Sequence, residues 1–174
     1  MVDLILKLRL SVSILFLLIL FSCEKQGHYL PAMTREGRNT IGFINTEGEV
    51  FGGATHEIDY NSTEQLLSII FLETKRVWSA EYLWRLDLEL KYDELIDSFK
   101  FQNATYTAKL IDYTIDSLEY NNFEIKYFDK TMRILSGNFE FNMATVISYS
   151  DTTYLDTAHT EKITRGRFDI VYPH

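Results

Sequence analysis

Several residue types are scarce in this chain, and each scarcity excludes a class of protein. The 174 residues contain one cysteine, two prolines and eight glycines. A single cysteine excludes an internal disulfide framework and a metal site built from several cysteines. So few prolines and glycines exclude a collagen-like chain and a proline-rich linker. Basic residues are outnumbered, 17 against 25 acidic ones, and the net charge of −8 argues against a nucleic-acid partner.

The remaining composition is that of one globular domain. Hydrophobic residues make up 46% of the chain, aromatic residues 14% and charged residues 24%. This balance is typical of a protein with a packed core, and it differs from that of a disordered chain or a membrane protein with many spans. A length of 174 residues also fits a single domain.

Residues 1–23 have the pattern of an export signal. Lys7 and Arg9 give a positive start, and Leu10–Phe21 is an apolar run of 12 residues interrupted by two serines. The run is shorter than the roughly 20 apolar residues of a membrane span, but it has the length of a signal-peptide core. The alternative is an N-terminal membrane anchor that is never cleaved, in which Cys23 has no role.

The end of this run, Leu20-Phe21-Ser22-Cys23, resembles the lipobox of bacterial lipoproteins. The resemblance implies that the Cys23 sulfur is alkylated with diacylglycerol, that the chain is cut just before Cys23, and that its new amine is acylated. Two or more acyl chains hold a protein stably on a membrane, whereas one does not. We therefore expect a signal peptide at 1–22, a lipidated flexible tether at 23–38 and a β domain at 39–174. The membrane, reached through the lipid on Cys23, is the expected partner.

Beyond the tether the hydrophobic pattern has a period of two. Apolar residues alternate with polar or charged ones over 84–91, 123–127, 139–143 and 168–172. Each such segment predicts a strand with one buried and one mostly wet face. Further strands are expected at Thr40–Ile44, Glu49–Phe51, Thr55–Tyr60, Leu66–Leu72 and Thr105–Tyr113. About nine short strands without a long helix predict an all-β fold, an antiparallel β-sandwich or barrel-like single domain.

Two segments carry more specific expectations. Leu66–Leu72 is almost continuously apolar, which predicts a central strand covered on both faces. Tyr92–Phe99 places Leu95, Ile96 and Phe99 at helical spacing, which predicts a short helical turn.

Three further segments are similar to a group of small β-rich lipoproteins of unknown function from Bacteroidota. They are LPAMTREGRNTIGF at 30–43, ILSGNFEF at 134–141 and ITRGRFD at 163–169. The resemblance implies a β fold and an envelope location, and it implies no catalytic residue and no cofactor. In that phylum an acidic run after the lipidated cysteine directs lipoproteins to the cell surface. Only Glu24 is acidic here, so we expect an outer-membrane protein on the periplasmic side.

The same phylum O-glycosylates exported proteins at Asp-Ser or Asp-Thr followed by a small or aliphatic residue. Three positions fit this pattern: Ser117, Thr152 and Thr157. The alternative is that these are ordinary turn residues, because Asp, Ser and Thr are common in turns.

Patterns that would indicate catalysis or metal binding are lacking in the sequence. The four histidines show no metal-ligand spacing, and no Gly-x-Ser-x-Gly nucleophile elbow occurs. Two carboxylate pairs, Glu57 with Asp59 and Asp87 with Glu89, resemble the acids of a glycosidase, but both fall on predicted wet faces. We therefore expect no enzyme activity, no catalytic residues, no cofactor and no metal site.

A binding or accessory role in the envelope, with a protein or glycan partner, is the leading hypothesis. Five aromatic residues near predicted strand ends could form a binding platform for carbohydrate or lipid: Tyr113, Tyr120, Phe128, Tyr149 and Tyr154. The second hypothesis is a lipocalin-like carrier, which requires an apolar internal pocket of about 300–1,000 Å³. The third is a hydrolase acting on glycans or peptides, which requires convergent acids, or a serine with a histidine, in one cleft.

Overall fold

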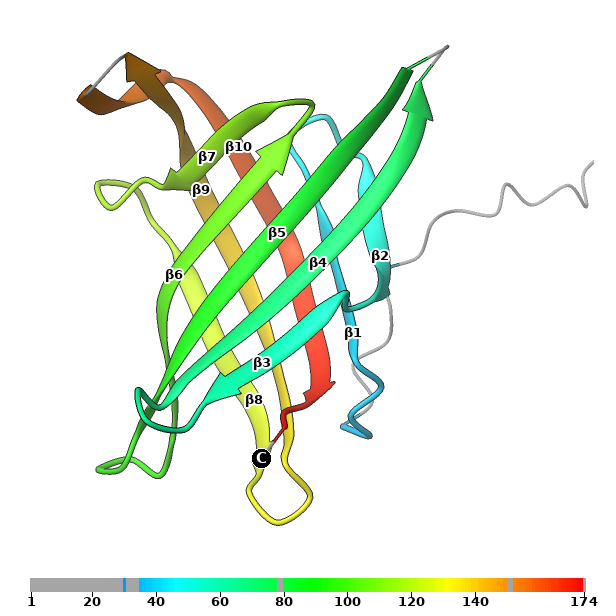
Figure 1. Ribbon diagram of the computed structural model, residues 1–174, viewed down its shortest axis with the longest axis vertical. Helices are drawn as coiled ribbons and strands as arrows, with labels where there is room; N and C mark the ends of the chain where they lie inside the picture. Colours follow the sequence, from blue (N-terminus) through cyan, green and yellow to red (C-terminus); the bar gives the residue numbers. More distant parts are fainter. Residues whose placement is uncertain (1–29, 31–34, 78–79, 150–151, 174) are drawn as a thin grey trace, which may run out of the picture.

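The computed structural model describes residues 30, 35–77, 80–149 and 152–173, and these form ten β-strands without a helix (Figure 1). The strands are β1 Thr40–Ile44, β2 Val50–Ala54, β3 Glu57–Asn61, β4 Leu66–Val77, β5 Ala80–Asp93, β6 Ser98–Ala108, β7 Ile111–Ile115, β8 Asn122–Asp129, β9 Ile134–Tyr149 and β10 Thr152–Val171. The predicted all-β, antiparallel, single-domain fold is confirmed. A helix of the length and apolarity needed to cross a membrane does not occur in these ranges.

All strands belong to one sheet. Its order is β2-β1-β10-β9-β7-β6-β5-β4-β3, and each recorded pairing is antiparallel. One edge of β9 pairs with β10. The other edge pairs with two strands, with β8 over Ile134–Glu140 and with β7 over Met143–Thr145. The end strands β2 and β3 are not hydrogen-bonded to each other in the described structure, so the sheet is not closed into a barrel.

The sheet nevertheless curls around a single aromatic core (Figure 1). Phe51 on β2 lies 5.7 Å from Trp84 on β5, and Phe43 on β1 lies 5.7 Å from Tyr106 on β6, both between ring centroids. These strands are far apart in the sheet order, so their rings can meet only across the interior. Burial of each large apolar side chain contributes about 1.5–3 kcal/mol, which makes this core the main stabilising feature.

Two phenylalanines on β9 and β10 pack over glycines on the opposite strand. Gly137 pairs with Phe168, and Gly166 pairs with Phe139. A β-carbon on Gly166 would lie 2.3 Å from the Phe139 ring, and one on Gly137 would lie 2.7 Å from the Phe168 ring. Only glycine leaves room for these rings, which explains the Ser-Gly-x-Phe and Arg-Gly-x-Phe patterns of the two segments.

Asp169 joins all three segments that carry the resemblance to Bacteroidota lipoproteins. This carboxylate is 1% exposed. It accepts hydrogen bonds from the Ser136 hydroxyl at 2.8 Å and from the backbone N–H groups of Gly37 at 3.0 Å and Glu36 at 3.3 Å. Asn39 adds a bond by accepting from the N–H of Val171 at 2.6 Å. The last residues of the predicted tether are therefore attached to β9 and β10.

Two local expectations are wrong, and both concern hairpin turns. Thr105–Tyr113 is two strands, β6 and β7, joined at Lys109 and Leu110, which both adopt a left-handed backbone with φ of 51° and 75°. Tyr92–Phe99 contains the β5–β6 hairpin turn and no helical turn. Leu95 and Ile96 point to solvent, 96% and 54% exposed.

The expectation for Leu66–Leu72 is wrong in one respect. The segment lies inside β4, which β3 and β5 flank, so it is not an edge strand. Leu67, Ile69 and Phe71 are buried, but Ile70 and Leu72 between them are only half-buried. One face of β4 covers the core, and the other face lies on the outside of the curled sheet.

Candidate functional site

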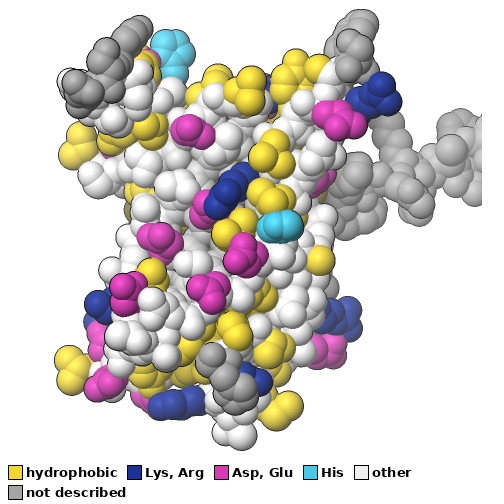
Figure 2. All heavy atoms as spheres, in the orientation of Figure 1, with side chains coloured by type: hydrophobic (Ala, Val, Ile, Leu, Met, Phe, Trp, Pro, Cys, Tyr) yellow, Lys and Arg dark blue, Asp and Glu magenta, His cyan; other side chains and the backbone are white. Residues whose placement is uncertain are grey.

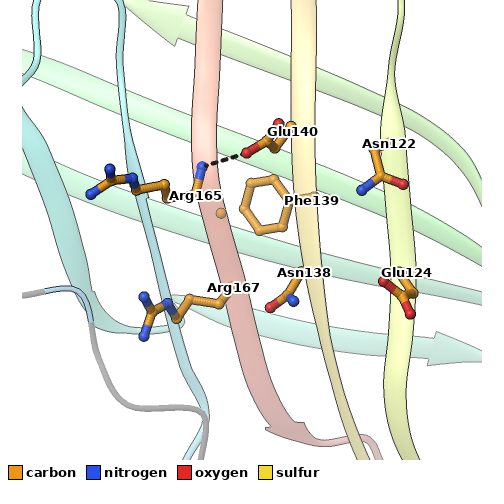
Figure 3. Close-up of a pocket in the computed structure, with 8 residues that line it drawn as sticks. Asn122, Glu124, Asn138, Phe139, Glu140, Arg165 and Arg167 are labelled. Atoms are coloured by element: carbon orange, nitrogen blue, oxygen red, sulfur yellow. Dashed lines mark hydrogen bonds between the residues drawn. The ribbon is translucent and has the colours of Figure 1, made fainter.

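A groove of about 420 Å³ runs over the outer face of β8, β9 and β10. Its polar lining consists of two carboxylates, two amides and two guanidinium groups, from Glu124, Glu140, Asn122, Asn138, Arg165 and Arg167. Figure 3 shows that β8 supplies Asn122, β9 supplies Asn138 and β10 supplies Arg167. The alternation of β9 explains the arrangement, because Phe139 is buried while Asn138 and Glu140 on either side of it reach the outer face.

A β-bulge in β10 shapes the basic side of this groove. The register with β9 shifts between Ile163 and Gly166, and Arg165 in the bulge is left-handed with a φ of 52°. The N–H of Arg165 donates to Glu140 Oε1 at 3.5 Å, which ties the bulge to β9. The side chains of Arg165 and Arg167 extend to the same side of β10 (Figure 3).

The groove offers both donors and acceptors of hydrogen bonds. Guanidinium groups only donate, carboxylates only accept, and amides do both. The Glu124 carboxylate is paired with the Lys126 ammonium at 2.5 Å, and the Glu140 carboxylate accepts the long bond from the N–H of Arg165. Serine, cysteine and histidine are missing from the lining residues. The chemistry is that of a surface for polar recognition.

A second polar region lies inside the curled sheet near the end where β4 and β6 stop. Three buried polar atoms there have no hydrogen-bond partner among the described residues: Glu73 Oε2, Trp84 Nε1 and Tyr106 Oη. Glu73 and Trp84 are direct cross-strand partners, and Tyr106 lies on the next strand. Unpaired polar atoms in an interior cost free energy, so this region has unused capacity for hydrogen bonding.

Charged groups surround this interior region. Burial, reinforced by the nearby Glu161 carboxylate, raises the pKa of the Tyr106 hydroxyl well above its ordinary value, and an interaction with the buried Asn45 side chain opposes part of this shift. The Lys75 ammonium lies 3.6 Å from the centroid of the Phe51 ring and 3.5 Å from Glu73 Oε1. Lys75 thereby reaches from β4 toward β2 and bridges strands near the two ends of the sheet order.

The predicted modification sites lie in different environments. Cys23 lies outside the described residues. Ser117 is exposed in the β7–β8 loop, next to a buried Asp116 whose Oδ1 accepts from the N–H of Leu118 at 2.9 Å. Thr152 and Thr157 are exposed on β10, the latter where the pairing with β9 is interrupted. All three hydroxyl positions are accessible, and glycosylation remains a prediction.

The predicted carboxylate pairs stand on the outer face of the sheet. Acidic side chains are spread over the face formed by β3 to β6 among neutral, apolar and basic ones (Figure 2). Asp87 is bound to the Arg85 guanidinium at 2.8 Å. In the described part of the chain, no three His, Cys, Asp or Glu side chains are placed to hold a metal ion.

Three carboxyl groups have pKa shifts opposite to the one that a general acid needs. Hydrogen bonds lower the pKa of three carboxyl groups: Asp93 through Lys100, Asp97 through Tyr92, and Asp156 through His159. A general acid needs the opposite shift, toward neutral pH. These carboxylates form local ion pairs and turns.

Of the five aromatic residues of the predicted platform, four have side chains that the structure describes, and only two of these four are exposed. Phe128 packs in the core 5.7 Å from Phe99, and Tyr113 lies half-buried 5.9 Å from Tyr106. Tyr120 is 73% exposed in the β7–β8 loop, and Tyr154 is 47% exposed on β10. The side chain of Tyr149 lies outside the described set.

Function has to be inferred from the chemistry of the site, because no protein-family model matches the chain and no curated protein or solved structure is significantly similar to it. Sequence reasoning did not find the groove, since its residues occupy positions 122–124, 138–140 and 165–167. The one available signal was the outward alternation of polar residues in the two Gly-x-Phe segments. These polar residues can be recognised as one site only when the register between the strands is known.

Proposed function

We propose that this protein is a lipid-anchored lipoprotein of the bacterial cell envelope that acts by binding rather than by catalysis. The anchor is supported by the sequence: a positive start, an apolar run of signal-peptide length, and Cys23 at its end. Position 23 lies twelve residues before Arg35, which faces the Tyr127 ring on β8 at 5.6 Å. A short chain therefore joins the proposed anchor to the domain.

The groove over β8–β10 is the observation that supports a binding role. Its carboxylates, amides and guanidinium groups come from three adjacent strands and so have fixed spacing. Sugar hydroxyls both donate and accept hydrogen bonds, and this lining matches both roles. We propose that the groove binds a glycan segment of the envelope, and that the protein faces the periplasm from the outer membrane. The similarity to Bacteroidota lipoproteins and the lack of an acidic run after Cys23 support that location.

Replacement of the cysteine tests the anchor. We expect the unchanged chain to incorporate labelled palmitate and to be shortened by residues 1–22, and we expect Cys23→Ala to do neither. Ser22→Gly is the control, because it keeps a small residue before the cysteine and should be processed normally. Cys23→Ala protein of mature size in the membrane fraction would contradict the anchor.

Titration with a panel of soluble envelope oligosaccharides tests the groove. Glu140→Gln should weaken binding roughly tenfold or more, because a hydrogen bond involving a charged group contributes about 1.5–3 kcal/mol. Asn138→Ala should weaken it by roughly two- to tenfold, because a neutral hydrogen bond contributes about 0.5–1.5 kcal/mol. Glu57→Gln, on the outer face of β3, is the matched control and should leave binding unchanged. Equal affinity of all variants, or no binding by any member of the panel, would contradict a glycan-binding groove.

A carrier function is the second candidate, favoured by Glu73 Oε2 and Trp84 Nε1, which are buried without a hydrogen-bond partner among the described residues. The described interior around them is filled by contacting aromatic rings, so a ligand would have to displace part of this core. A ligand with both a donor and an acceptor group would satisfy the carboxylate, the indole and the Tyr106 hydroxyl. Native mass spectrometry of gently purified protein tests this idea. A co-purifying small molecule that Tyr106→Phe releases would support a carrier, and a protein of bare polypeptide-plus-lipid mass would contradict it.

A further inference from the structure

The groove over β8–β10 is basic on one side only. Its two guanidinium groups, from Arg165 and Arg167, come from β10, and both extend away from β9 (Figure 3). Its amides and its carboxylates come from β8 and β9. A ligand that crosses the three strands therefore meets amide and carboxylate groups over β8 and β9 and guanidinium groups over β10.

The lining of the groove, together with the cation that pairs with it, carries a positive net charge. Lys126 neutralises Glu124 on the same strand and adds its ammonium to the two guanidinium groups. These three positive groups stand against two carboxylates, those of Glu124 and Glu140. The whole chain has the opposite sign, with a net charge of −8. The groove is therefore a place on an acidic protein where the local charge favours an anionic group.

Arg165 has an unusual backbone for a strand residue. It is the only non-glycine residue with positive φ inside a described strand, at 52°, and it lies in the bulge between Ile163 and Gly166. A left-handed backbone costs an arginine free energy, and strain of this kind is concentrated at functional sites. Arg165 is exposed, and among the described residues no carboxylate lies within ion-pair distance of its guanidinium. This guanidinium is thus available to a ligand.

A guanidinium group suits an anion with two oxygens. Its planar N–H fork binds both oxygens of a carboxylate or a phosphate at once. Arg167 lies two positions further along β10, about 6.5–7 Å away, and extends to the same side as Arg165 (Figure 3). Two long side chains at that spacing can converge on one anion.

We infer that the ligand of the groove is a glycan segment with one anionic group, a carboxylate or a phosphate, at one end. Arg165 and Arg167 bind the anion over β10. The amides and the Glu140 carboxylate bind sugar hydroxyls over β8 and β9. A second anion over β9 would meet the Glu140 carboxylate and be repelled, so the rest of the segment is uncharged. The inference rests on the proposed function, because it takes the groove as a glycan-binding site.

Matched oligosaccharides with and without the anion test this inference on the full-length, processed protein in mild detergent. The probes are trisaccharides that end in glucuronic, galacturonic or mannuronic acid, and the same trisaccharides with the carboxyl reduced to a neutral hydroxymethyl group. A third set carries a phosphate on that hydroxymethyl group. Calorimetric titration should show an anionic form binding roughly tenfold more tightly than its neutral form, because hydrogen bonds to charged groups are the stronger ones. The anion that gives the larger preference identifies the source, carboxylate or phosphate.

Replacement of the arginine assigns this preference to the groove. Arg165→Gln should reduce it to less than roughly threefold, and Arg165→Lys, which keeps the charge but lacks the fork, should lie in between. The readout is the ratio of two affinities of one variant, so a loss of folded protein does not imitate it. Arg76→Gln is the matched control, because it removes the same charge from an exposed position on β4 and should leave the ratio unchanged.

Three results would overturn the inference. Equal affinity of the unchanged protein for anionic and neutral forms would overturn it and leave the glycan-binding groove standing. A full preference that survives when Arg165→Gln is combined with Arg167→Gln would place the anion elsewhere. No binding of any form would overturn the glycan-binding groove, and with it the inference that depends on it.

Discussion

Replacement of Asp169 by alanine should be among the most damaging single changes in the domain. The carboxylate is buried and accepts from the Ser136 hydroxyl and from two backbone N–H groups, those of Glu36 and Gly37. Alanine removes the acceptor for all three donors at once. The donors belong to β9 and to the segment before β1, so the loss would loosen the attachment of both to β10.

The magnitude follows from the burial of the donors. Each hydrogen bond to a charged acceptor contributes about 1.5–3 kcal/mol, and a donor left buried without a partner costs about 1–3 kcal/mol. Ser136 is fully buried, whereas the other two bonds are only partly buried. We expect a loss of about 4 kcal/mol from a free energy of unfolding of about 5–15 kcal/mol. For a chain of this size the melting temperature should fall by about 8–16 °C.

Urea denaturation of the full chain in mild detergent, followed by tryptophan fluorescence and circular dichroism, measures this loss. Asp112→Ala is the control, because Asp112 also accepts from a hydroxyl, that of Thr107 at 2.7 Å, but is exposed. It should change stability by less than about 0.5 kcal/mol. If Asp169→Ala costs less than about 1 kcal/mol, or if its effect simply adds to that of Ser136→Ala, the junction is not the cooperative unit described.

Three further predictions concern packing, an unpaired hydroxyl and a titration. Gly166→Ala should destabilise the domain by about 1–3 kcal/mol through its clash with Phe139, and additivity with Phe139→Leu in a double-mutant cycle would refute the clash. Tyr106→Phe should change stability by less than about 1 kcal/mol, because the hydroxyl has no partner at hydrogen-bond distance among the described residues, and a larger loss on thermal unfolding would show that its interaction with Asn45 is a stabilising hydrogen bond. By NMR the pKa of Asp97 should lie below its ordinary 3.8, and Tyr92→Phe should raise it. The stabilisation from this bond is present at higher pH and is lost as pH falls through the folded-state pKa; an unshifted Asp97 would contradict the bond.

The strands that sequence reasoning placed best are those with strict alternation. In β5, Trp84, Leu86 and Leu88 are at most 1% exposed, as expected for one buried face. Thr40–Ile44 was predicted with its observed bounds. A period of two carries this information because successive side chains of a strand point to opposite faces. The same rule cannot show where paired strands extend beyond the core, as in the 20-residue β10.

The hairpin at Lys109 and Leu110 shows why one boundary was missed. A two-residue turn of this kind requires positive φ at both central positions, and Asn-Gly or Asp-Gly is the usual sequence. Lys109 and Leu110 both adopt positive φ, although neither is a residue type that favours this backbone conformation. Lys109 of this turn forms an ion pair with Glu47 in the β1–β2 turn at 3.1 Å. Local propensity was overruled by tertiary structure, which a sequence pattern cannot reveal.

The candidate sites depended on information that local patterns lack. The groove needs the register of three strands, and the interior polar atoms need to be known as buried before their lack of partners has meaning. Glu73 in particular continues the inward face of β4, after Leu67, Ile69 and Phe71. Its charge alone would place it on the wet side of any strand.

The most direct test of the central claim is mass spectrometry of the N-terminal peptide of the protein isolated from envelope membranes. We expect a peptide that begins at Cys23, lacks residues 1–22, and carries diacylglycerol on the sulfur and an acyl group on the amine. An unmodified Cys23 thiol in a chain that still contains residues 1–22 would contradict that claim.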